Sequence, residues 1–169
     1  KGVMIQHNNV SNLISWHQTV YGLTQHDRTT QVAGPAFDAV VWELWPTLTA
    51  GAALYIMDDE TRSSPEHLLQ WLADQSITVS FLPTPLAEAV LRAALPANLA
   101  LRLLLTGGDR LHHAPAALPF TLVNNYGPTE NTVVTTWIAL PPDAADPLPP
   151  IGRPIFNTQV YLLDAQQQP

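Results

Sequence analysis

The sequence contains no cysteine and few basic residues, and both absences exclude classes of function. Without cysteine in its 169 residues, the chain has no disulfide framework, no thiolate metal site and no cysteine nucleophile. Lys and Arg total 7 against 14 Asp and Glu, and the formal net charge is -7. Because tight binding to nucleic acid requires clustered positive charge, this balance argues against DNA or RNA as a partner.

The chain also lacks the marks of a membrane or exported protein. No apolar run reaches the roughly 18 residues that a membrane span needs. The opening Lys1-Gly2-Val3-Met4 has neither the basic region nor the cleavage site of a signal peptide. We therefore expect no membrane partner and a cytoplasmic location, with which the absence of cysteine is compatible.

What the chain does contain is enough apolar sequence for one sizeable core. Its hydrophobic share of 46% is typical of a globular protein. We expect residues 1–140 to form one α/β subdomain. Prolines then become frequent, and we interpret residues 141–169 as an extended connection that leads into a strand at 159–163. Because the sequence opens inside Lys-Gly-Val and closes on a polar turn, we expect it to be a piece of a longer polypeptide.

Helical and strand patterns alternate along residues 1–140. Apolar residues at steps of three and four predict helices at 8–22, from 37 to Gly51, from Ser64-Pro65 onward, and from Pro85 to Leu95. Short apolar or β-branched runs predict strands at 29–33, 53–57, 77–82, 101–105 and 118–123. This alternation predicts an α/β fold with a mostly parallel sheet and helices on both faces.

Two polar stretches directly follow predicted strands. Gly107-Gly108-Asp109 lies just beyond the strand at 101–105, and the turn Asn124-Asn125-Tyr126-Gly127-Pro128-Thr129-Glu130 follows the strand at 118–123. In parallel sheets, ligands bind beyond the carboxyl ends of the strands, so we expect both stretches to line one cleft. The second stretch offers an amide, an aromatic ring, a hydroxyl and a carboxylate. These groups suit a base and a metal ion.

Several motifs together resemble one family, the amino-acid adenylation domains of nonribosomal peptide synthetases, in the adenylate-forming, AMP-binding superfamily. The motifs that agree in order and spacing are Lys1-Gly2-Val3, Phe37-Asp38-Ala39, Trp42-Glu43, Tyr126-Gly127-Pro128-Thr129-Glu130 and Ile151-Gly152-Arg153-Pro154. Gly107-Gly108-Asp109 after a strand also agrees, although the family usually has Gly-Gly or Ala-Gly followed by Glu. The resemblance covers almost the whole chain. It implies the flavodoxin-like subdomain of the adenylate-forming fold.

The resemblance also implies a reaction and its participants. Adenylation domains join the carboxylate of an amino acid to the α-phosphate of ATP, with Mg²⁺ present, and release pyrophosphate. The implied partners are the remainder of the adenylation domain and the condensation and peptidyl carrier domains of a parent synthetase, with phosphopantetheine on the carrier domain only. The start of the phosphate-binding loop, a ribose-binding Asp and a C-terminal subdomain with a catalytic Lys are implied to lie outside this chain. We therefore expect the isolated chain to be inactive.

Family roles on the nucleotide side carry over to the polar stretches. The implied nucleotide contacts are Gly108, Asp109, Asn125, Tyr126 and Thr129. In this arrangement the ring of Tyr126 stacks on adenine, and the amide of Asn125 or its backbone bonds the base edge. Thr129, placed for a phosphate oxygen, and Glu130, which resembles the magnesium carboxylate, are the expected catalytic residues. Outside this motif, we would interpret Tyr126 as a core residue and Glu130 as a solvated side chain.

The amino-acid side of the site follows from the same resemblance. In the family, the residue at Asp38 binds the substrate ammonium group, although an Asp at a helix start is usually a capping residue. The implied pocket consists of Asp38, Ala39, Trp42, Phe81, Leu105, Gly107, Asn125, Val133 and Val134. This string resembles the pattern for leucine activation, and its walls are mostly apolar. We expect a branched aliphatic substrate, first of all L-leucine, although one methylene discriminates by only about 1 to 3 kcal/mol.

Two other functions stay open at this point. An acyl- or aryl-CoA ligase of the same superfamily shares the Tyr-Gly-Pro-Thr-Glu stretch. Asp38 argues against this function, because the carboxylic acid substrate of such a ligase has no ammonium group for Asp38 to bind. The other alternative is a noncatalytic subdomain, excised or transplanted from a larger enzyme, that folds but turns nothing over.

Overall fold

A computed structural model describes residues 2–141 and 147–168. Lys1 of the Lys1-Gly2-Val3 motif and residues 142–146 of the predicted connection lie outside the described residues. The helices are α1 (His7–Tyr21), α2 (Ala39–Thr49), α3 (Asp59–Ser63), α4 (Pro65–Asp74), α5 (Thr84–Arg92) and the short 3-10 helix η1 (Thr129–Asn131). The strands are β1 (Arg28–Gln31), β2 (Ala53–Ile56), β3 (Val79–Pro83), β4 (Leu103–Gly107), β5 (Thr121–Tyr126), β6 (Thr136–Ala139) and β7 (Arg153–Pro154).

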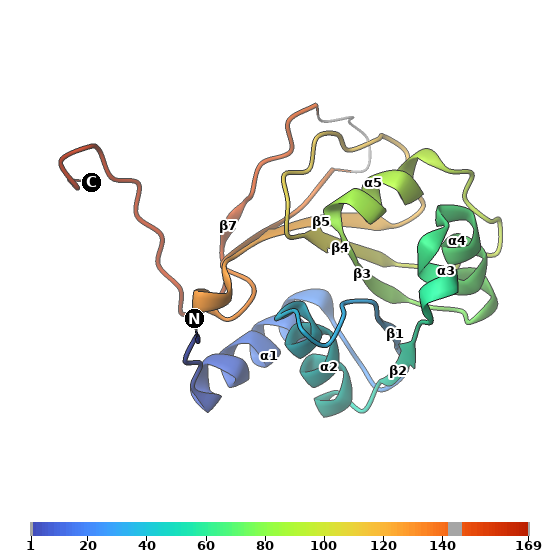
Figure 1. Ribbon diagram of the computed structural model, residues 1–169, viewed down its shortest axis with the longest axis horizontal. Helices are drawn as coiled ribbons and strands as arrows, with labels where there is room; N and C mark the ends of the chain where they lie inside the picture. The colour runs from blue at the N-terminus through green and yellow to red at the C-terminus, as the bar shows by residue number, and fades with distance from the viewer. Residues whose placement is uncertain (1, 142–146, 169) are drawn as a thin grey trace.

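The strands form one seven-stranded sheet in the order β2-β1-β3-β4-β5-β6-β7. The five strands from β2 to β5 are parallel, and β6 and β7 add two antiparallel strands at one edge. The predicted α/β fold with a mostly parallel sheet is therefore confirmed. Figure 1 shows the sheet between its helices, with the C-terminal residues extending away from it.

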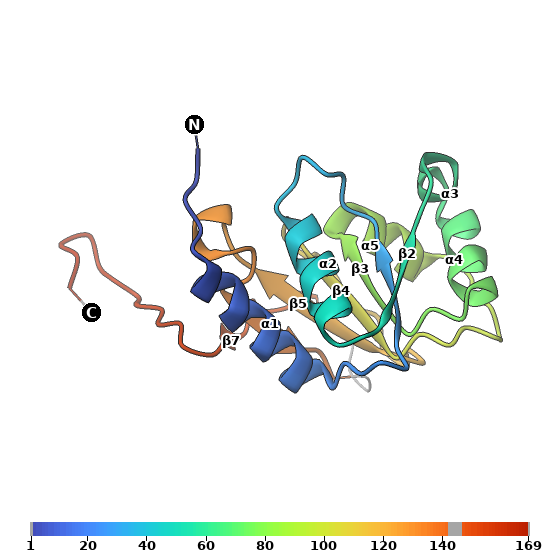
Figure 2. The ribbon, with the colours of Figure 1, turned by 90° about the horizontal axis from the view of Figure 1, so that it is seen from below.

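Helices cover both faces of the sheet (Figures 1 and 2), with α1 and α2 on one face and α4 and α5 on the other. Successive side chains of a strand point to opposite faces, so each inner strand supplies both cores. In β4, Leu103 and Leu105 pack with α1 and α2, whereas Leu104 packs with α4 and α5. This alternation explains why the inner strands are apolar at consecutive positions.

The connections of β1 and β3 diverge to opposite faces of the sheet. β1 leads into α2 on one face, and its neighbour β3 leads into α5 on the other. In doubly wound sheets a crevice opens at such a point, beyond the carboxyl ends of the strands. The topology thus predicts a ligand site beyond the carboxyl ends of β1 and β3.

Three predictions of local structure were wrong. Asn124 to Tyr126, predicted to be a turn, continue β5, because the antiparallel β6 supplies backbone partners as far as the Tyr126–Thr136 pair. Residues 159–163 form no strand, because no described strand lies beside them to share backbone hydrogen bonds. α1 begins earlier than predicted, with Gln6 rather than Asn8-Asn9 as its N-cap. Within the described residues, no helix is both long and apolar enough to span a membrane.

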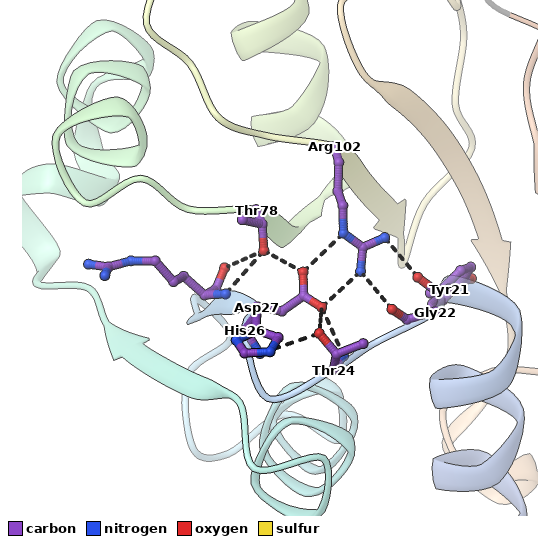
Figure 3. A network of polar contacts seen from close by, with 8 residues as sticks. Tyr21, Gly22, Thr24, His26, Asp27, Thr78 and Arg102 are labelled. Carbon is purple, nitrogen blue, oxygen red and sulfur yellow. Dashed lines mark hydrogen bonds and ion pairs between the residues drawn. The ribbon is translucent and has the colours of Figure 1, made fainter.

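A polar network around Asp27 and Arg102 fixes the C-terminal end of α1 to the sheet (Figure 3). Arg102 Nε and Nη2 donate to the Asp27 carboxylate at 3.0 and 3.1 Å. The same guanidinium donates to the carbonyl oxygens of Tyr21 at 2.8 Å and Gly22 at 3.3 Å, which satisfies acceptors that a helix end leaves free. Burial raises the pKa of Asp27, but hydrogen bonds from Arg102 and Thr78 help to outweigh it and hold that pKa below its usual range.

Arg102→Met tests how much this network stabilises the fold. The Asp27 side chain is only 8% exposed, so its carboxylate would lose its charged partner in a nearly dry position. Because the Arg102 side chain is 39% exposed, we expect a loss of about 2 kcal/mol, below the value for a fully buried pair. This corresponds to a fall of about 4 to 8 °C in the thermal midpoint measured by circular dichroism near neutral pH.

Arg92→Met is the matched control, because Arg92 pairs with Glu88 while 72% exposed. We expect it to change stability by less than about 0.5 kcal/mol. Since the pKa of Asp27 is lowered on folding, its contribution is present above the ordinary carboxyl pKa and is lost as pH falls through the lowered value. The effect of Arg102→Met should therefore shrink in acid. Equal thermal midpoints for Arg102→Met and Arg92→Met at neutral pH would contradict the proposed contribution of Arg102 to stability.

Candidate functional site

The residues predicted to bind the amino acid line one small cavity. Its volume is about 60 Å³, and its lining residues are Asp38, Ala39, Trp42, Phe81, Gly107, Gly108, Asn125, Gly127, Val133 and Val134. Leu105 is absent from the lining. It is 2% exposed and packs in the same apolar core as Trp42, Phe81 and Val134, so it supports the wall from behind. We call this cavity the amino-acid pocket.

Four elements and one turn supply these side chains. Asp38 directly precedes α2, and Ala39 and Trp42 lie in its first turn; because positions three and four apart are neighbours on a helix, the three residues are close to one another. β3, β4 and β5 contribute Phe81 and the residues near their carboxyl ends, and the turn before β6 contributes the two valines. The amino-acid pocket therefore lies at the carboxyl ends of the parallel strands, where the topology predicts a ligand site.

Asp38 does not act as a helix cap. It precedes α2, but its side chain makes no capping hydrogen bond. Its Oδ2 instead accepts a hydrogen bond of 2.5 Å from Thr129 Oγ1, so two motifs 91 residues apart meet at the rim of the pocket. The half-buried carboxylate is thus held at the pocket mouth by the opposite turn, where a cation can reach it.

A second cavity adjoins the first, with a volume of about 390 Å³. Among the predicted nucleotide contacts, Gly108, Asp109, Asn125 and Tyr126 line this cavity, and Thr129 does not. We call it the nucleotide cavity after this prediction. The side chain of Tyr126 projects with 52% of its surface exposed, so its ring can serve as a stacking face. Gly108, Asn125 and Gly127 border both cavities.

The proline-rich connection contributes a wall to the nucleotide cavity, which the sequence pattern did not predict. Pro149 and Ile151 line the cavity, and Asn124 Nδ2 donates to the carbonyl oxygen of Pro150 at 2.8 Å. Asn124 is 3% exposed. Asn124 was predicted to lie in a turn, and its partner lies 26 residues away, so no local pattern indicated this contact.

Asn125 is the side chain at the junction of the two cavities. It is 4% exposed, and its Oδ1 accepts a hydrogen bond of 2.8 Å from the Tyr21 hydroxyl. Its Nδ2 donates to the carbonyl oxygens of Thr106 at 3.2 Å and Val123 at 3.3 Å. Because both ends of the amide have protein partners, Asn125 is fixed as a wall between the cavities.

The turn after β5 returns so closely that one of its positions requires glycine. A Cβ atom at Gly127 would lie 2.3 Å from the carbonyl oxygen of Val133 and 2.6 Å from the Thr135 nitrogen. Thr132 and Val133 have φ angles of 57° and 70°, which cost β-branched residues about 1 to 3 kcal/mol each. Such strain is typical of a functional turn, and here it brings Val133 against the amino-acid pocket.

Glu43 fixes the loop that carries Asp38. Its carboxylate is 6% exposed and accepts hydrogen bonds from the backbone N–H groups of Val32 at 2.7 Å and Ala33 at 3.0 Å. Burial raises the pKa of Glu43 to about 7, although these N–H groups and the charge of Arg62 favour the carboxylate. The Trp42-Glu43 motif therefore places one residue in the pocket and the next under the adjoining loop.

Glu130 is exposed on η1 and makes no clustered metal site. Within residues 2–141 and 147–168, no group of three or more His, Cys, Asp or Glu side chains is arranged to hold a metal ion. Mg²⁺ that arrives with a nucleotide needs only one or two carboxylates in addition to phosphates and water. A single exposed carboxylate fits such a cation and does not fit a resident metal.

Comparison with known proteins places the chain in a family. The sequence matches the AMP-binding enzyme family over residues 1–169. It is 57% identical to a linear gramicidin synthase protein of Brevibacillus parabrevis, over 100% of this chain and 2% of that protein. It is 47% identical to bacitracin synthase 1 of Bacillus licheniformis, over 99% of this chain and 3% of that protein.

A solved structure agrees with these relatives. The nonribosomal peptide synthetase FmoA3, in its form bound to alpha-methyl-L-serine-AMP, matches 100% of this chain and 20% of its own with a TM-score of 0.86 and 27% identity. The chain spans only 2% and 3% of the two curated relatives. The chain therefore belongs to the AMP-binding enzyme family, as its resemblance to the adenylation domains of nonribosomal peptide synthetases predicts.

Proposed function

We propose that this chain is the substrate-selecting part of an adenylation domain that activates L-leucine with ATP to leucyl-AMP and pyrophosphate. One observation carries the proposal. The residues of the leucine-type string, apart from Leu105, line a single cavity that shares Asn125 and Gly127 with a larger cavity suited to a nucleotide. The FmoA3 structure with an aminoacyl-AMP supports the same pairing of ligands, since the two folds match over the whole chain.

The amino-acid pocket suits an aliphatic amino acid because its charge lies at the mouth and its walls are apolar. Asp38 at the mouth can pair with the ammonium group, which offsets the cost of partly burying both charges. Trp42, Phe81 and Val134 surround the side chain, and removing a leucine side chain from water contributes about 1.5 to 3 kcal/mol. With its ammonium group and side chain held in this way, the amino acid would direct its carboxylate toward the border that the two cavities share.

At that border the two reactants would meet. Tyr126 offers its exposed ring to adenine, and Gly108 with Asp109 bounds the other side of the cavity. Holding both reactants in one geometry removes much of the entropic barrier to their reaction. Glu130 would hold the magnesium ion that accompanies ATP, and that ion offsets the negative charge of the phosphates when bound. Thr129 donates to Asp38 and lines neither cavity; we propose that it contacts a phosphate oxygen when ATP is bound.

We assign this activity to a parent synthetase rather than to the isolated chain. The same proposal includes condensation and carrier domains as partners, phosphopantetheine on the carrier domain only, and a cytoplasmic location. The chain matches small parts of very long synthetases, which supports the presence of further domains.

Amino-acid-dependent exchange of labelled pyrophosphate into ATP, measured on the parent adenylation domain, tests the substrate. We expect the highest kcat/KM with leucine, a loss of about 10- to 200-fold with valine, and a larger loss with aspartate, whose charge the apolar walls reject. A clear preference for phenylalanine or aspartate would defeat the leucine assignment.

Asp38→Ala removes the proposed ammonium partner. We expect kcat/KM for leucine to fall by about 100-fold or more, because the ammonium group would be left without its counter-charge, while KM for ATP stays nearly constant. Asp74→Ala is the control, since Asp74 ends α4, lines neither cavity and accepts a hydrogen bond from Gln70. Unchanged leucine kinetics in Asp38→Ala would sink the assignment.

Glu130→Gln removes the proposed magnesium carboxylate while it preserves side-chain size. We expect the Mg²⁺ concentration for half-maximal exchange to rise by about tenfold or more, with little change in KM for leucine. Glu60→Gln, at the exposed start of α3, provides the comparison. If the two variants respond equally to a magnesium titration, Glu130 is not the metal ligand.

A further inference from the structure

The back of the amino-acid pocket rests on α1, a helix that contributes no residue to the lining. His17 and Tyr21 lie four residues apart, so they share one face of the helix. They are 5% and 4% exposed. Both carry polar atoms into an apolar core, where most buried polar groups have hydrogen-bond partners because an unpaired one costs free energy.

His17 holds the indole of Trp42. The Trp42 Nε1–H donates to His17 Nδ1 at 2.8 Å, and the two rings meet edge to face with centroids 5.9 Å apart. Burial, together with the positive charge of Arg102, lowers the pKa of His17 to about 3. The ring is therefore neutral at physiological pH, and Nδ1 keeps the lone pair that accepts the hydrogen bond. Since the indole has one donor, this bond fixes its rotation.

Tyr21 holds the amide of Asn125 on the other side of the pocket. Its hydroxyl donates to Asn125 Oδ1 at 2.8 Å, a contact between positions 104 residues apart. Burial raises the pKa of Tyr21 well above its usual value despite the hydrogen bond to Asn125, so the hydroxyl stays protonated and remains a donor. The bond also fixes which end of the amide faces α1.

Ring contacts join these two hydrogen bonds into one continuous series. His17 and Tyr21 meet edge to face with ring centroids 4.8 Å apart. The ring centroids of Trp42 and Phe81, which both line the pocket, are 5.1 Å apart. The series runs from Phe81 through Trp42, His17 and Tyr21 to Asn125. Two walls of the amino-acid pocket are thereby tied to the same helix.

The helix itself is held in place at both sides. Arg102 binds the carbonyl oxygens at the end of α1, and Gln18 Nε2 donates to the Pro46 carbonyl oxygen at 3.0 Å and to Thr49 Oγ1 at 2.9 Å in α2. α1 therefore cannot shift along α2 without breaking these bonds. A side chain that such a helix presents has a defined position.

We propose that His17 and Tyr21 are positioning residues that set the selectivity of the amino-acid pocket by fixing Trp42 and Asn125. The identity of the bound amino acid in this proposal rests on the proposed function. An indole without an acceptor turns to find another partner, and the width of the pocket then changes. Such a pocket still admits an amino acid but discriminates less well between side chains of different size.

The test uses pyrophosphate exchange by the parent adenylation domain with three variants. His17→Phe removes the acceptor and keeps a ring. His17→Asn places an amide oxygen close to the position of Nδ1, and Tyr21→Phe removes one oxygen atom. KM and kcat are measured for leucine, valine and phenylalanine, together with KM for ATP and the thermal midpoint of each protein.

We expect His17→Phe to raise KM for leucine by about tenfold and to reduce the preference for leucine over valine and phenylalanine, because a buried donor loses its partner. KM for ATP should stay within about twofold. His17→Asn should restore much of the preference. Tyr21→Phe should raise KM for leucine by about threefold, since Asn125 keeps its other hydrogen bonds. His67→Phe, on the exposed surface of α4, is the control.

A merely structural role gives a different result. It lowers kcat and the thermal midpoint alike for every amino acid, leaves the preference unchanged and is not rescued by His17→Asn. That outcome overturns the proposal.

If His17→Phe does not fold, Tyr21→Phe carries the test. If the unmodified enzyme prefers another amino acid, the leucine assignment fails, and the same comparison made with that amino acid still decides the positioning role.

Discussion

The ion pair between Asp27 and Arg102 fixes the end of α1, and the geometry of the amino-acid pocket depends on where that helix lies. Arg102 directly precedes β4, the strand that ends at Gly107, so the network sets the helix against the strand that delivers a pocket residue. From this fixed end, Tyr21 reaches Asn125. An ion pair at the amino ends of the parallel strands thus determines the position of side chains near their carboxyl ends.

The two cavities are best understood as one site that a single segment divides. Asn125 lies near the end of β5, the turn after β5 returns through a strained backbone, and Val133 comes back to the pocket. The same segment exposes Tyr126 to the nucleotide cavity. A wall shared in this way places the ends of two ligands side by side without a separate positioning element, which suits the reaction that we propose.

Local patterns were enough to predict most of the sheet and helices, because apolar runs and helical periodicity are properties of short segments. Motif residues such as Asp38 were predictable for the same reason. The sequence did not indicate that Asn125 continues β5, because its antiparallel partner lies beyond the turn. Nor did it reveal His17 or the role of Glu43. Their contacts, to Trp42 and to the backbone of Val32, join residues 25 and 11 positions apart with no periodic signal.

A crystal structure of the parent adenylation domain with leucine and a nonhydrolysable ATP analogue tests most directly whether one segment serves both ligands. We expect the leucine side chain beside Trp42 and Val134, its ammonium group within hydrogen-bonding distance of Asp38, and adenine against Tyr126. The leucine carboxylate should then face the α-phosphate across Asn125 and Gly127. Leucine bound outside this pocket, or adenine remote from Tyr126, would contradict a shared site.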